Sequence, residues 1–221
     1  MNIELNIDEL KKFDEEVFSP FYKDKFPERP GDDTYPFWAM DRYHVYYRLF
    51  GYLSTLFNDS TFVELGTRRG HAAASLAFNS SNTVHTYDNQ TFDIEAHNGS
   101  TVFDKMKNIN YHVLPSINTT TPLGNILDKP EHVEIILNSD LIFVDVDPHS
   151  GEHEQQFFDF LIDNDYKGIT LWDDVKVHLN EWFDSVQPHG SWKFYRLLPP
   201  YTWDDGNTGV ICHGDQEFIF N

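Results

Sequence analysis

Residues 62–70 read Phe-Val-Glu-Leu-Gly-Thr-Arg-Arg-Gly, and this stretch decides the fold. Its apolar start is typical of a buried strand, and its two glycines favour a sharp turn before a helix expected over 71–78. In open α/β sheets, ligands bind beyond the carboxyl ends of the strands, so we expect a ligand at this turn. A dinucleotide fingerprint needs a third glycine, which makes a dehydrogenase the least favoured class.

Strands and helices alternate outward from this turn. Strands are expected over 61–65, 83–87, 109–114, 140–146, 168–172, 193–198 and 209–213, and helices over 71–78, 93–107, 152–163 and 174–186. This order predicts a doubly wound, mostly parallel α/β sheet of seven strands, with an antiparallel strand at the C-terminal end. We expect one domain over 61–221 and an N-terminal helical extension or lid over 1–60, with helices over 8–18 and 41–57.

The net charge of the chain indicates which classes of binding partner to expect. The 221 residues include 16 Lys plus Arg and 36 Asp plus Glu, which gives a formal net charge of −20. So acidic a surface repels phosphate groups, so we expect neither nucleic acid nor an anionic membrane as a partner. Cys212 is the only cysteine, and no secretion signal or apolar run of about 20 residues stands out. A cytoplasmic location is therefore expected, and a homo-oligomer stays open.

Two acidic residues bear on the ligand of the glycine turn. Glu64 precedes the glycines, and a carboxylate there would repel a pyrophosphate but suits a cationic ligand. Asp88 ends the second expected strand, 18 residues after Gly70. An acid at that point can accept hydrogen bonds from ribose hydroxyls, as it does in nucleoside-binding α/β folds.

The segment 62–70 resembles the first motif of class I S-adenosylmethionine-dependent methyltransferases, and the resemblance extends over about residues 61–213. It implies S-adenosylmethionine as cofactor, with the turn on its methionine part and the acid after the second strand on its ribose. One of Arg68 and Arg69 is expected to pair with Glu64 or to contact the methionine carboxylate. The residues implied in cofactor binding are Glu64, Gly66, Thr67, Arg68, Gly70, His71 and Asp88.

Carboxylates follow two further strands of the predicted sheet. Asp145 and Asp147 come at the end of the fourth strand, and Asp173 and Asp174 directly after the fifth. If the two strands are neighbours, about 4.8 Å apart, these groups converge and require a cation to stay ionised together. Oxygen ligands suit Mg²⁺, Mn²⁺ or Ca²⁺. The alternative is that they only cap helices and turns.

This paired pattern is similar to the metal-dependent small-molecule and sugar O-methyltransferases of the same superfamily. The resemblance implies Asp145, Asp173 and Asp174 as ligands of a divalent cation, with Mg²⁺ favoured, and Asp147 as the catalytic base. The sequence departs from the pattern at Val146, where members often have glycine, and at Pro148-His149. His149 therefore competes with Asp147 for the role of base.

Together these features predict metal-assisted O-methyl transfer to a sugar, a glycan or another hydroxylated small molecule. One alternative is a non-catalytic protein that binds S-adenosylmethionine or a nucleoside, in which the carboxylates are structural. Another is a metal-dependent, hydroxylase-like enzyme on the same scaffold, because a fold alone does not determine its chemistry.

Overall fold

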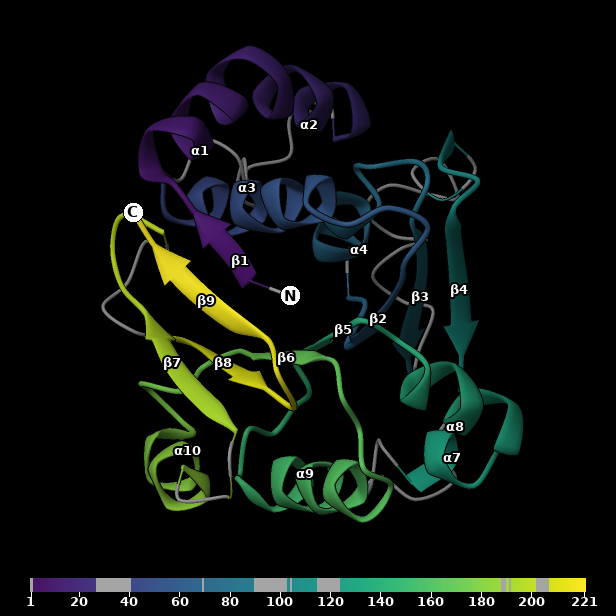
Figure 1. Cartoon of the computed structure of the whole chain (residues 1–221). Helices are drawn as coiled ribbons and strands as arrows, with labels where there is room; N and C mark the ends of the chain where they lie inside the picture. Colours follow the sequence, from purple (N-terminus) through teal and green to yellow (C-terminus); the bar gives the residue numbers. More distant parts are fainter. Residues whose placement is uncertain are drawn as a thin grey trace.

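Among the described residues, seven strands form a central sheet with helices on both of its faces (Figure 1). The computed structural model describes residues 2–26, 41–68, 70–89, 103, 105–114, 124–187, 190, 192–201 and 207–221, with the backbone alone for 41–46 and 124–125. The strand order is β4-β3-β2-β5-β6-β8-β7, and this confirms the predicted fold class.

The elements follow one another largely as the alternating pattern predicts. The strands are β1 (Asn2–Leu5), β2 (Thr61–Leu65), β3 (Thr83–Asp88), β4 (Ile109–Val113), β5 (Leu141–Val144), β6 (Ile169–Trp172), β7 (Lys193–Leu197), β8 (Thr208–Cys212) and β9 (Glu217–Phe220). The helices are α1 (Ile7–Phe13), the π-helical segment η1 (Asp14–Phe18), α2 (Ser19–Lys25), α3 (Asp41–Thr55), α4 (His71–Leu76), α7 (Gly124–Leu127), α8 (Pro130–Leu137), α9 (Glu152–Asp163) and α10 (Asn180–Val186).

The five strands from β2 to β6 run parallel to one another. β8 is antiparallel to both of its neighbours, β6 and β7, so the predicted antiparallel pair at the end of the sheet is confirmed. The carboxyl ends of β2, β3, β5 and β6 therefore lie along one edge of the sheet. Every residue placed in the candidate site by the sequence ends or follows one of these four strands, apart from Glu64, which lies within β2, and His71, which opens α4.

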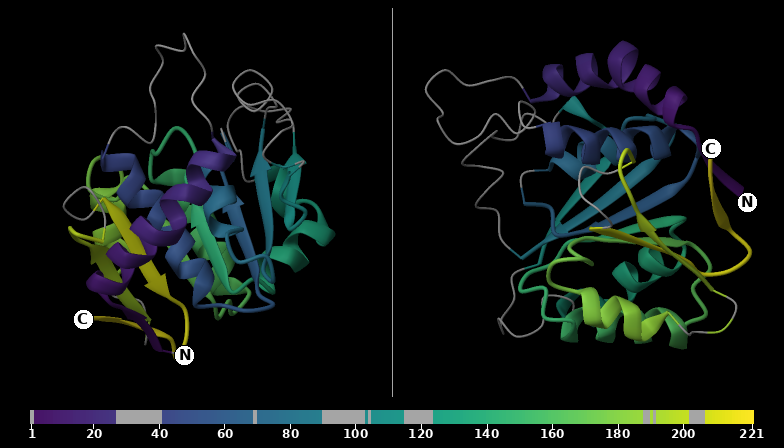
Figure 2. Two further views of the ribbon diagram at one scale, coloured as in Figure 1. Left: turned by 90° about the horizontal axis from the view of Figure 1, so that it is seen from above. Right: turned by 90° about the vertical axis from the view of Figure 1, so that its left-hand side faces the viewer.

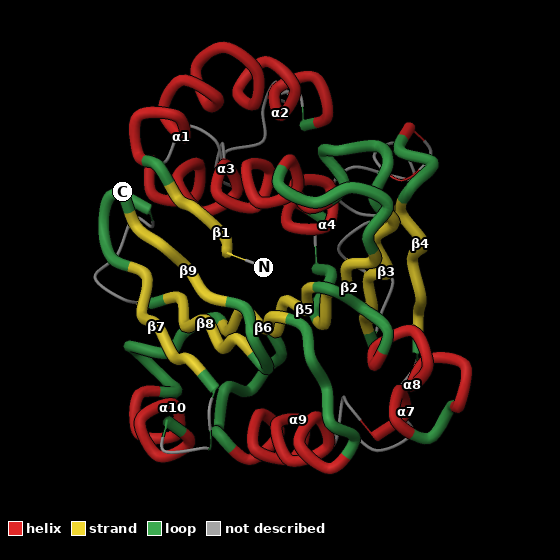
Figure 3. Tube along the Cα trace, in the orientation of Figure 1, coloured by secondary structure: helices red, strands yellow, loops and turns green. Residues whose placement is uncertain are grey.

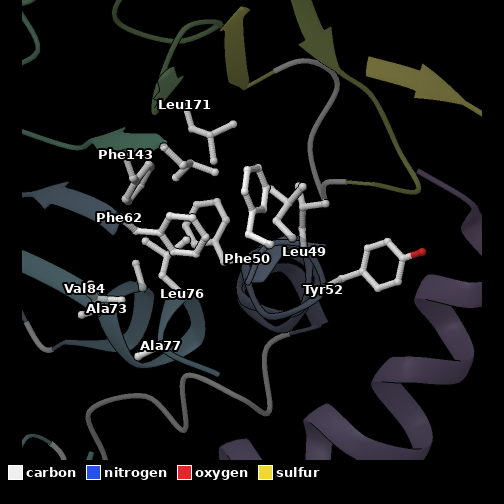
Figure 4. Close-up of a cluster of buried hydrophobic side chains, with 14 of the residues drawn as sticks. Leu49, Phe50, Tyr52, Phe62, Ala73, Leu76, Ala77, Val84, Phe143 and Leu171 are labelled. Atoms are coloured by element: carbon white, nitrogen blue, oxygen red, sulfur yellow. The ribbon is translucent and has the colours of Figure 1, made fainter. Parts of the chain in front are cut away.

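Alternate side chains of the central strands pack into two cores, one on each face of the sheet. Phe62 and Phe143 are buried on the face that α3 and α4 cover, whereas Ile142 and Val144 are buried against α9 and α10. Figure 4 shows Phe50 of α3 directed at the first of these cores. The four residues of β5 are all buried, as a strand covered on both faces requires.

The N-terminal segment forms an outer layer over this fold. α3 lies between the sheet and the helices α1 and α2 (Figures 1 and 2). β1 pairs in parallel with β9, with Ile3 opposite Phe218, so both ends of the chain meet in a second, two-stranded sheet (Figure 3). The Tyr201 hydroxyl donates to the Leu5 carbonyl at 3.0 Å and fastens this sheet to the β7–β8 connection. The division at residues 60 and 61 stays a prediction.

Several expected boundaries differ from the structure. The helix expected over 174–186 is wrong over nearly its first half, because residues 174–179 form bends and turns and the helix begins only at Asn180. Asp174 has a φ of 55°, a left-handed conformation that a right-handed helix does not accommodate. The helix expected over 93–107 lies largely outside the described residues.

The sequence pattern also leaves elements unpredicted. α8 and the four-residue strands β1 and β9 are too short for periodicity to identify. The helix expected over 8–18 instead begins at Ile7 and continues through η1 into α2. No helix in the described part of the chain is both long and apolar enough to cross a bilayer.

Candidate active site

The turn after β2 depends on two glycines for its shape. Gly66 has a φ of 102°, and a Cβ there would lie 1.8 Å from the carbonyl oxygen of Asp145, so only glycine fits. Gly70 has a φ of 75°, and a Cβ there would lie 2.7 Å from the Phe103 ring. The Gly66 N–H donates to the Tyr87 carbonyl at 2.9 Å and so ties the turn to β3.

Asp88, the predicted ribose ligand, contacts this turn directly. The backbone N–H of Arg68 donates to Asp88 Oδ2 at 2.7 Å, and Arg68 itself has a left-handed φ of 46°. A non-glycine residue in this conformation is uncommon and is held by its surroundings. The glycine turn and the acid after β3, which are separate in sequence, thus form one structural unit.

Glu64 lies beneath the turn, with only 1 % of its surface exposed. Its carboxylate accepts from the Thr86 hydroxyl, which in turn lies 2.6 Å from the Thr67 hydroxyl. Burial raises the pKa of Glu64 well above its usual range, the bond from Thr86 lowers it, and the charges of Asp145 and Asp88 raise it further. A cationic ligand at the turn would favour the charged form of Glu64 and lower its pKa, whereas a pyrophosphate would not.

His71, the first residue of α4, joins the turn to the N-terminal layer. The Tyr22 hydroxyl of α2 lies 2.6 Å from His71 Nδ1. The Phe26 ring stacks on the imidazole with centroids 4.1 Å apart, and the Tyr47 ring of α3 stacks at 5.4 Å. The predicted cofactor turn is therefore covered by aromatic side chains from the N-terminal layer.

The carboxylates predicted at the ends of β5 and β6 converge around one imidazole. His149 Nε2 lies 3.6 Å from Asp145 Oδ1, 3.6 Å from Asp147 Oδ1 and 3.7 Å from Asp174 Oδ2. Asp173 continues the pairing of the two strands, because its N–H donates to the carbonyl of the last residue of β5 at 3.0 Å. We call Asp145, Asp147, Asp173, Asp174 and His149 the carboxylate cluster.

Mutual repulsion shows in the titration of this cluster. Burial, together with the charges of Asp174 and Asp147, raises the pKa of Asp145 to about 7, and Arg68 opposes the rise. Burial, Asp145 and Asp174 likewise raise the pKa of Asp173 well above its usual range. The charged forms of Asp145 and Asp173 are thus disfavoured in the folded protein, and a bound cation would favour them.

Asn207, which the sequence did not indicate, holds the last carboxylate in place. Its side-chain N–H donates to Asp174 Oδ1 at 3.0 Å, and its carbonyl accepts from the Val175 N–H at 2.9 Å. Asp174 and His149 both have left-handed backbones, with φ of 55° and 51°. Such conformations cost energy and gather at functional sites, where the surroundings impose them.

The chemistry of the donors fits a divalent cation. Carboxylates from two adjacent strand ends are hard oxygen ligands. The pKa values of Asp145 and Asp173 are raised, and a bound cation would favour their charged forms. Within the described residues, no group of three His, Cys, Asp or Glu side chains already has metal-ligand geometry. Binding an ion therefore requires the oxygens to close in around the position that the imidazole of His149 now borders.

The structure brings the predicted residues together in two adjoining groups, one at the glycine turn and one in the carboxylate cluster. It adds Tyr22, Tyr47 and Asn207, which sequence reasoning missed. The crowding of aromatics near α3 is visible in the sequence, but which ring reaches the turn depends on how the helices pack. Asn207 stands about 30 residues beyond Asp174, and no spacing rule connects them.

The sequence matches no protein-family model and no curated protein. Solved structures, in contrast, match nearly the whole chain. A candidate caffeoyl-CoA O-methyltransferase from Staphylococcus aureus is similar at a TM-score of 0.55 and 15 % identity, over 93 % of this chain and 92 % of that one. The chain has the class I methyltransferase fold.

Two further structures agree with this class I methyltransferase fold. An SAH-bound methyltransferase from Podospora anserina matches with a TM-score of 0.55 and 13 % identity, over 94 % of this chain and 95 % of that one. An O-methyltransferase from Bacillus cereus in complex with SAH matches with a TM-score of 0.52 and 14 % identity, over 91 % and 90 %. At such identities the likeness establishes the fold, and the activity has to be argued from the site.

Proposed function

We propose that this protein is an S-adenosylmethionine-dependent O-methyltransferase that acts, with the help of a divalent cation, on a sugar or another hydroxylated small molecule. The class I methyltransferase fold supports the cofactor. The carboxylate cluster supports the cation and the hydroxylated acceptor.

The observation that carries the proposal is the direct contact between the two groups of site residues. The space in which a Gly66 side chain would lie is filled by the Asp145 carbonyl, and the Asp145 N–H donates to the Leu65 carbonyl at 2.9 Å. A methyl donor at the glycine turn and an acceptor at the carboxylate cluster would thus lie side by side. Methyl transfer needs this arrangement, because donor and acceptor atoms must be held in line.

The residues of the turn would bind and orient the methyl donor. The carboxylate of Asp88 is placed to accept from ribose hydroxyls, and its contact with the Arg68 N–H keeps it beside the turn. A sulfonium at the turn would favour the charged form of Glu64 against the effect of burial. When bound, S-adenosylmethionine supplies an activated methyl group, so the protein has only to position it and exclude water.

The residues of the carboxylate cluster would hold the acceptor and remove its proton. Asp145, Asp173 and Asp174 would hold a divalent cation, which lowers the pKa of a hydroxyl that it coordinates. Between the two candidate bases we favour His149. Its side chain is 13 % exposed and its Nε2 is surrounded by three carboxylates, whereas the side chain of Asp147 is 98 % exposed. A proton on Nε2 would be held among those oxygens.

The proposal extends to partners and location. A net charge of −20 favours a neutral or cationic small molecule over nucleic acid, and it accords with a cytoplasmic protein. Vicinal hydroxyls on the acceptor would suit two-point binding at a cation.

Calorimetric titration tests the cofactor part of the proposal. We expect S-adenosylmethionine and SAH to bind with micromolar affinity both in Mg²⁺ and in EDTA, because the glycine turn contains no predicted metal ligand. Asp88→Ala should weaken SAH binding about tenfold through the lost ribose contact. Asp163→Asn, which removes an exposed carboxylate at the far end of α9, should leave the affinity unchanged.

A screen of hydroxylated acceptors with labelled S-adenosylmethionine tests the reaction. Turnover that requires Mg²⁺ and is lost in EDTA is the expected result. Binding of SAH without turnover on any acceptor would favour a non-catalytic binding protein, and failure to bind SAH in either buffer would contradict the proposal.

A further inference from the structure

The N-terminal layer reaches the glycine turn through α2. Tyr22 of α2 and Phe26, the residue that follows this helix, both contact the imidazole of His71, the first residue of α4. All three side chains are buried. The outer layer and the start of α4 therefore meet in a packed contact inside the protein rather than at its surface.

One hydrogen bond and two stacked rings hold the imidazole of His71. The Tyr22 hydroxyl lies 2.6 Å from its Nδ1. The Phe26 ring stacks on it with centroids 4.1 Å apart and planes 27° apart, and the Tyr47 ring of α3 stacks on it at 5.4 Å and 25°. Stacking is compatible with either flipped orientation of an imidazole, whereas the hydrogen bond selects the nitrogen that faces α2. Tyr22 therefore determines which nitrogen of His71 is directed elsewhere.

The Tyr22 hydroxyl keeps its proton, because burial raises its pKa well above the usual range and the neighbouring Tyr47 adds to the rise. A protonated phenol donates to Nδ1 of His71, so a neutral imidazole carries its own proton on Nε2. An N–H at Nε2 is a hydrogen-bond donor, and it suits an anionic oxygen such as that of a carboxylate.

His71 stands directly beside the position expected for the methyl donor. It follows Gly70, the last residue of the glycine turn, and this turn is held to Asp88 through the Arg68 N–H at 2.7 Å. Ligands of open α/β sheets bind at this edge, beyond the carboxyl ends of the strands. In S-adenosylmethionine, the methionine part alone has a carboxylate, so a donor on His71 would meet that part of the molecule.

We propose that Tyr22 is a positioning residue for the methyl donor, because its hydrogen bond orients His71 so that the Nε2–H meets the methionine carboxylate. The inference rests on the proposed function and gives the N-terminal layer a part in the methyl-donor half of the site. Tyr22 acts through His71 rather than on the donor itself.

Two ligands that differ in the methionine part test the inference. SAH has the amino-acid group, whereas methylthioadenosine keeps the adenosine and lacks the carboxylate. Tyr22→Phe keeps the ring and removes the hydroxyl, so we expect it to weaken SAH binding about fivefold and methylthioadenosine binding by less than about twofold. A merely structural role of Tyr22 would weaken the binding of both ligands to the same extent. Calorimetric titration measures these affinities.

A double-mutant cycle on SAH binding tests whether Tyr22 acts through His71. His71→Phe keeps a stacked ring and removes both nitrogens, so it should weaken SAH binding at least as much as Tyr22→Phe does. Adding Tyr22→Phe to His71→Phe should then change the affinity by less than about twofold, because the hydrogen bond is already absent.

Tyr52→Phe is the matched control, because it removes a tyrosine hydroxyl from another contact between the layers, in which Tyr52 of α3 donates to Glu9 of α1 at 3.0 Å. It should keep the wild-type affinity for both ligands, and thermal unfolding should show that all variants fold. Equal weakening of both ligands or an unchanged SAH affinity in Tyr22→Phe, or additive losses in the cycle, would overturn the inference and leave the proposed function standing. A wild-type chain that binds no SAH would overturn both.

Discussion

Two clusters of titratable side chains differ in whether their groups are paired with one another inside the protein. The carboxylate cluster at the ends of β5 and β6 gathers like charges, and burial and neighbouring carboxylates raise the pKa of Asp145 and Asp173. The second cluster consists of His85 on β3, His112 on β4 and His132 on α8, and we call it the histidine cluster. Its rings are hydrogen-bonded to one another or to Tyr87.

The imidazoles of the histidine cluster have hydrogen-bond partners within the protein. His85 Nδ1 lies 3.0 Å from His112 Nε2, and the Tyr87 hydroxyl lies 3.2 Å from His132 Nδ1. The His112 ring also stacks on Tyr87 with centroids 4.5 Å apart. Burial lowers the pKa of all three histidines, and that of His112 falls to about 4. These imidazoles are neutral at pH 7, with His132 buried and His85 and His112 half-buried.

The difference is the one expected between a structural cluster and a ligand-binding one. Neutral groups that pair internally need nothing from outside, whereas a group of carboxylates with raised pKa values is completed only by a ligand. The comparison makes the histidine cluster a built-in control for every experiment on the carboxylate cluster.

The largest expected effect separates the two clusters by activity. Asp145→Ala should lower methyl transfer by about a thousandfold, since it removes a charge from the reacting centre, while SAH still binds. Turnover on an acceptor found by screening, together with an SAH titration, measures both. His112→Phe should change turnover by less than about twofold, because the histidine cluster takes no part in the reaction. Equal losses in the two variants would remove the distinction.

Gly66→Ala should disrupt the close contact between the glycine turn and the backbone carbonyl of Asp145, a member of the carboxylate cluster. The new Cβ would meet the Asp145 carbonyl in a backbone of φ 102°, and we expect a loss of about 3 kcal/mol in the free energy of unfolding. Urea unfolding measures it. Gly190→Ala is the control, because it has φ +60° but nothing within 4 Å, and it should cost about 1 kcal/mol. A Gly66→Ala protein as stable as the control would show that the glycine turn is not tightly packed against the Asp145 carbonyl.

These outcomes bear on what the sequence can predict. Asp145 and Asp173 were placed side by side because consecutive parallel strands end at one edge, and Asp88 was placed at the turn for the same reason. Tyr22 and His71 are 49 residues apart, and their contact depends on how α2 lies against the start of α4. The late start of α10 comes from the left-handed backbone of Asp174, which no residue pattern predicts. Strand-end chemistry is therefore readable from sequence, whereas contacts between layers are not.

The histidine cluster predicts loss of stability in acid. The pKa of His112 is lower in the folded than in the unfolded chain, so its neutral form favours folding above pH 6.5 and that contribution falls as the pH drops toward about 4. Glu131 and Lys129 flank His132 and act in opposite directions on its pKa. His112→Phe should reduce the difference in stability between pH 7 and pH 5 by about 1 kcal/mol, allowing for solvent screening. Urea unfolding at the two pH values measures it, and an undiminished difference would contradict the assignment.

The carboxylate cluster predicts a pH dependence of stability with the opposite sign. Because the pKa of Asp145 is raised to about 7 in the folded chain, its contribution to stability is full below about pH 4 and is lost as the pH rises toward 7. Asp145→Asn should therefore raise the free energy of unfolding at pH 7 in EDTA by about 1 kcal/mol. Thermal unfolding at pH 7 measures the gain. A variant less stable than the wild type would show that the cluster is already compensated.

A crystal structure grown with SAH and Mg²⁺ tests the central claim most directly. We predict SAH between the Gly66–Gly70 turn and Asp88, and an ion held by Asp145, Asp173 and Asp174 beside it. SAH bound away from the turn, or a crystal without SAH at saturating concentration, would contradict the account.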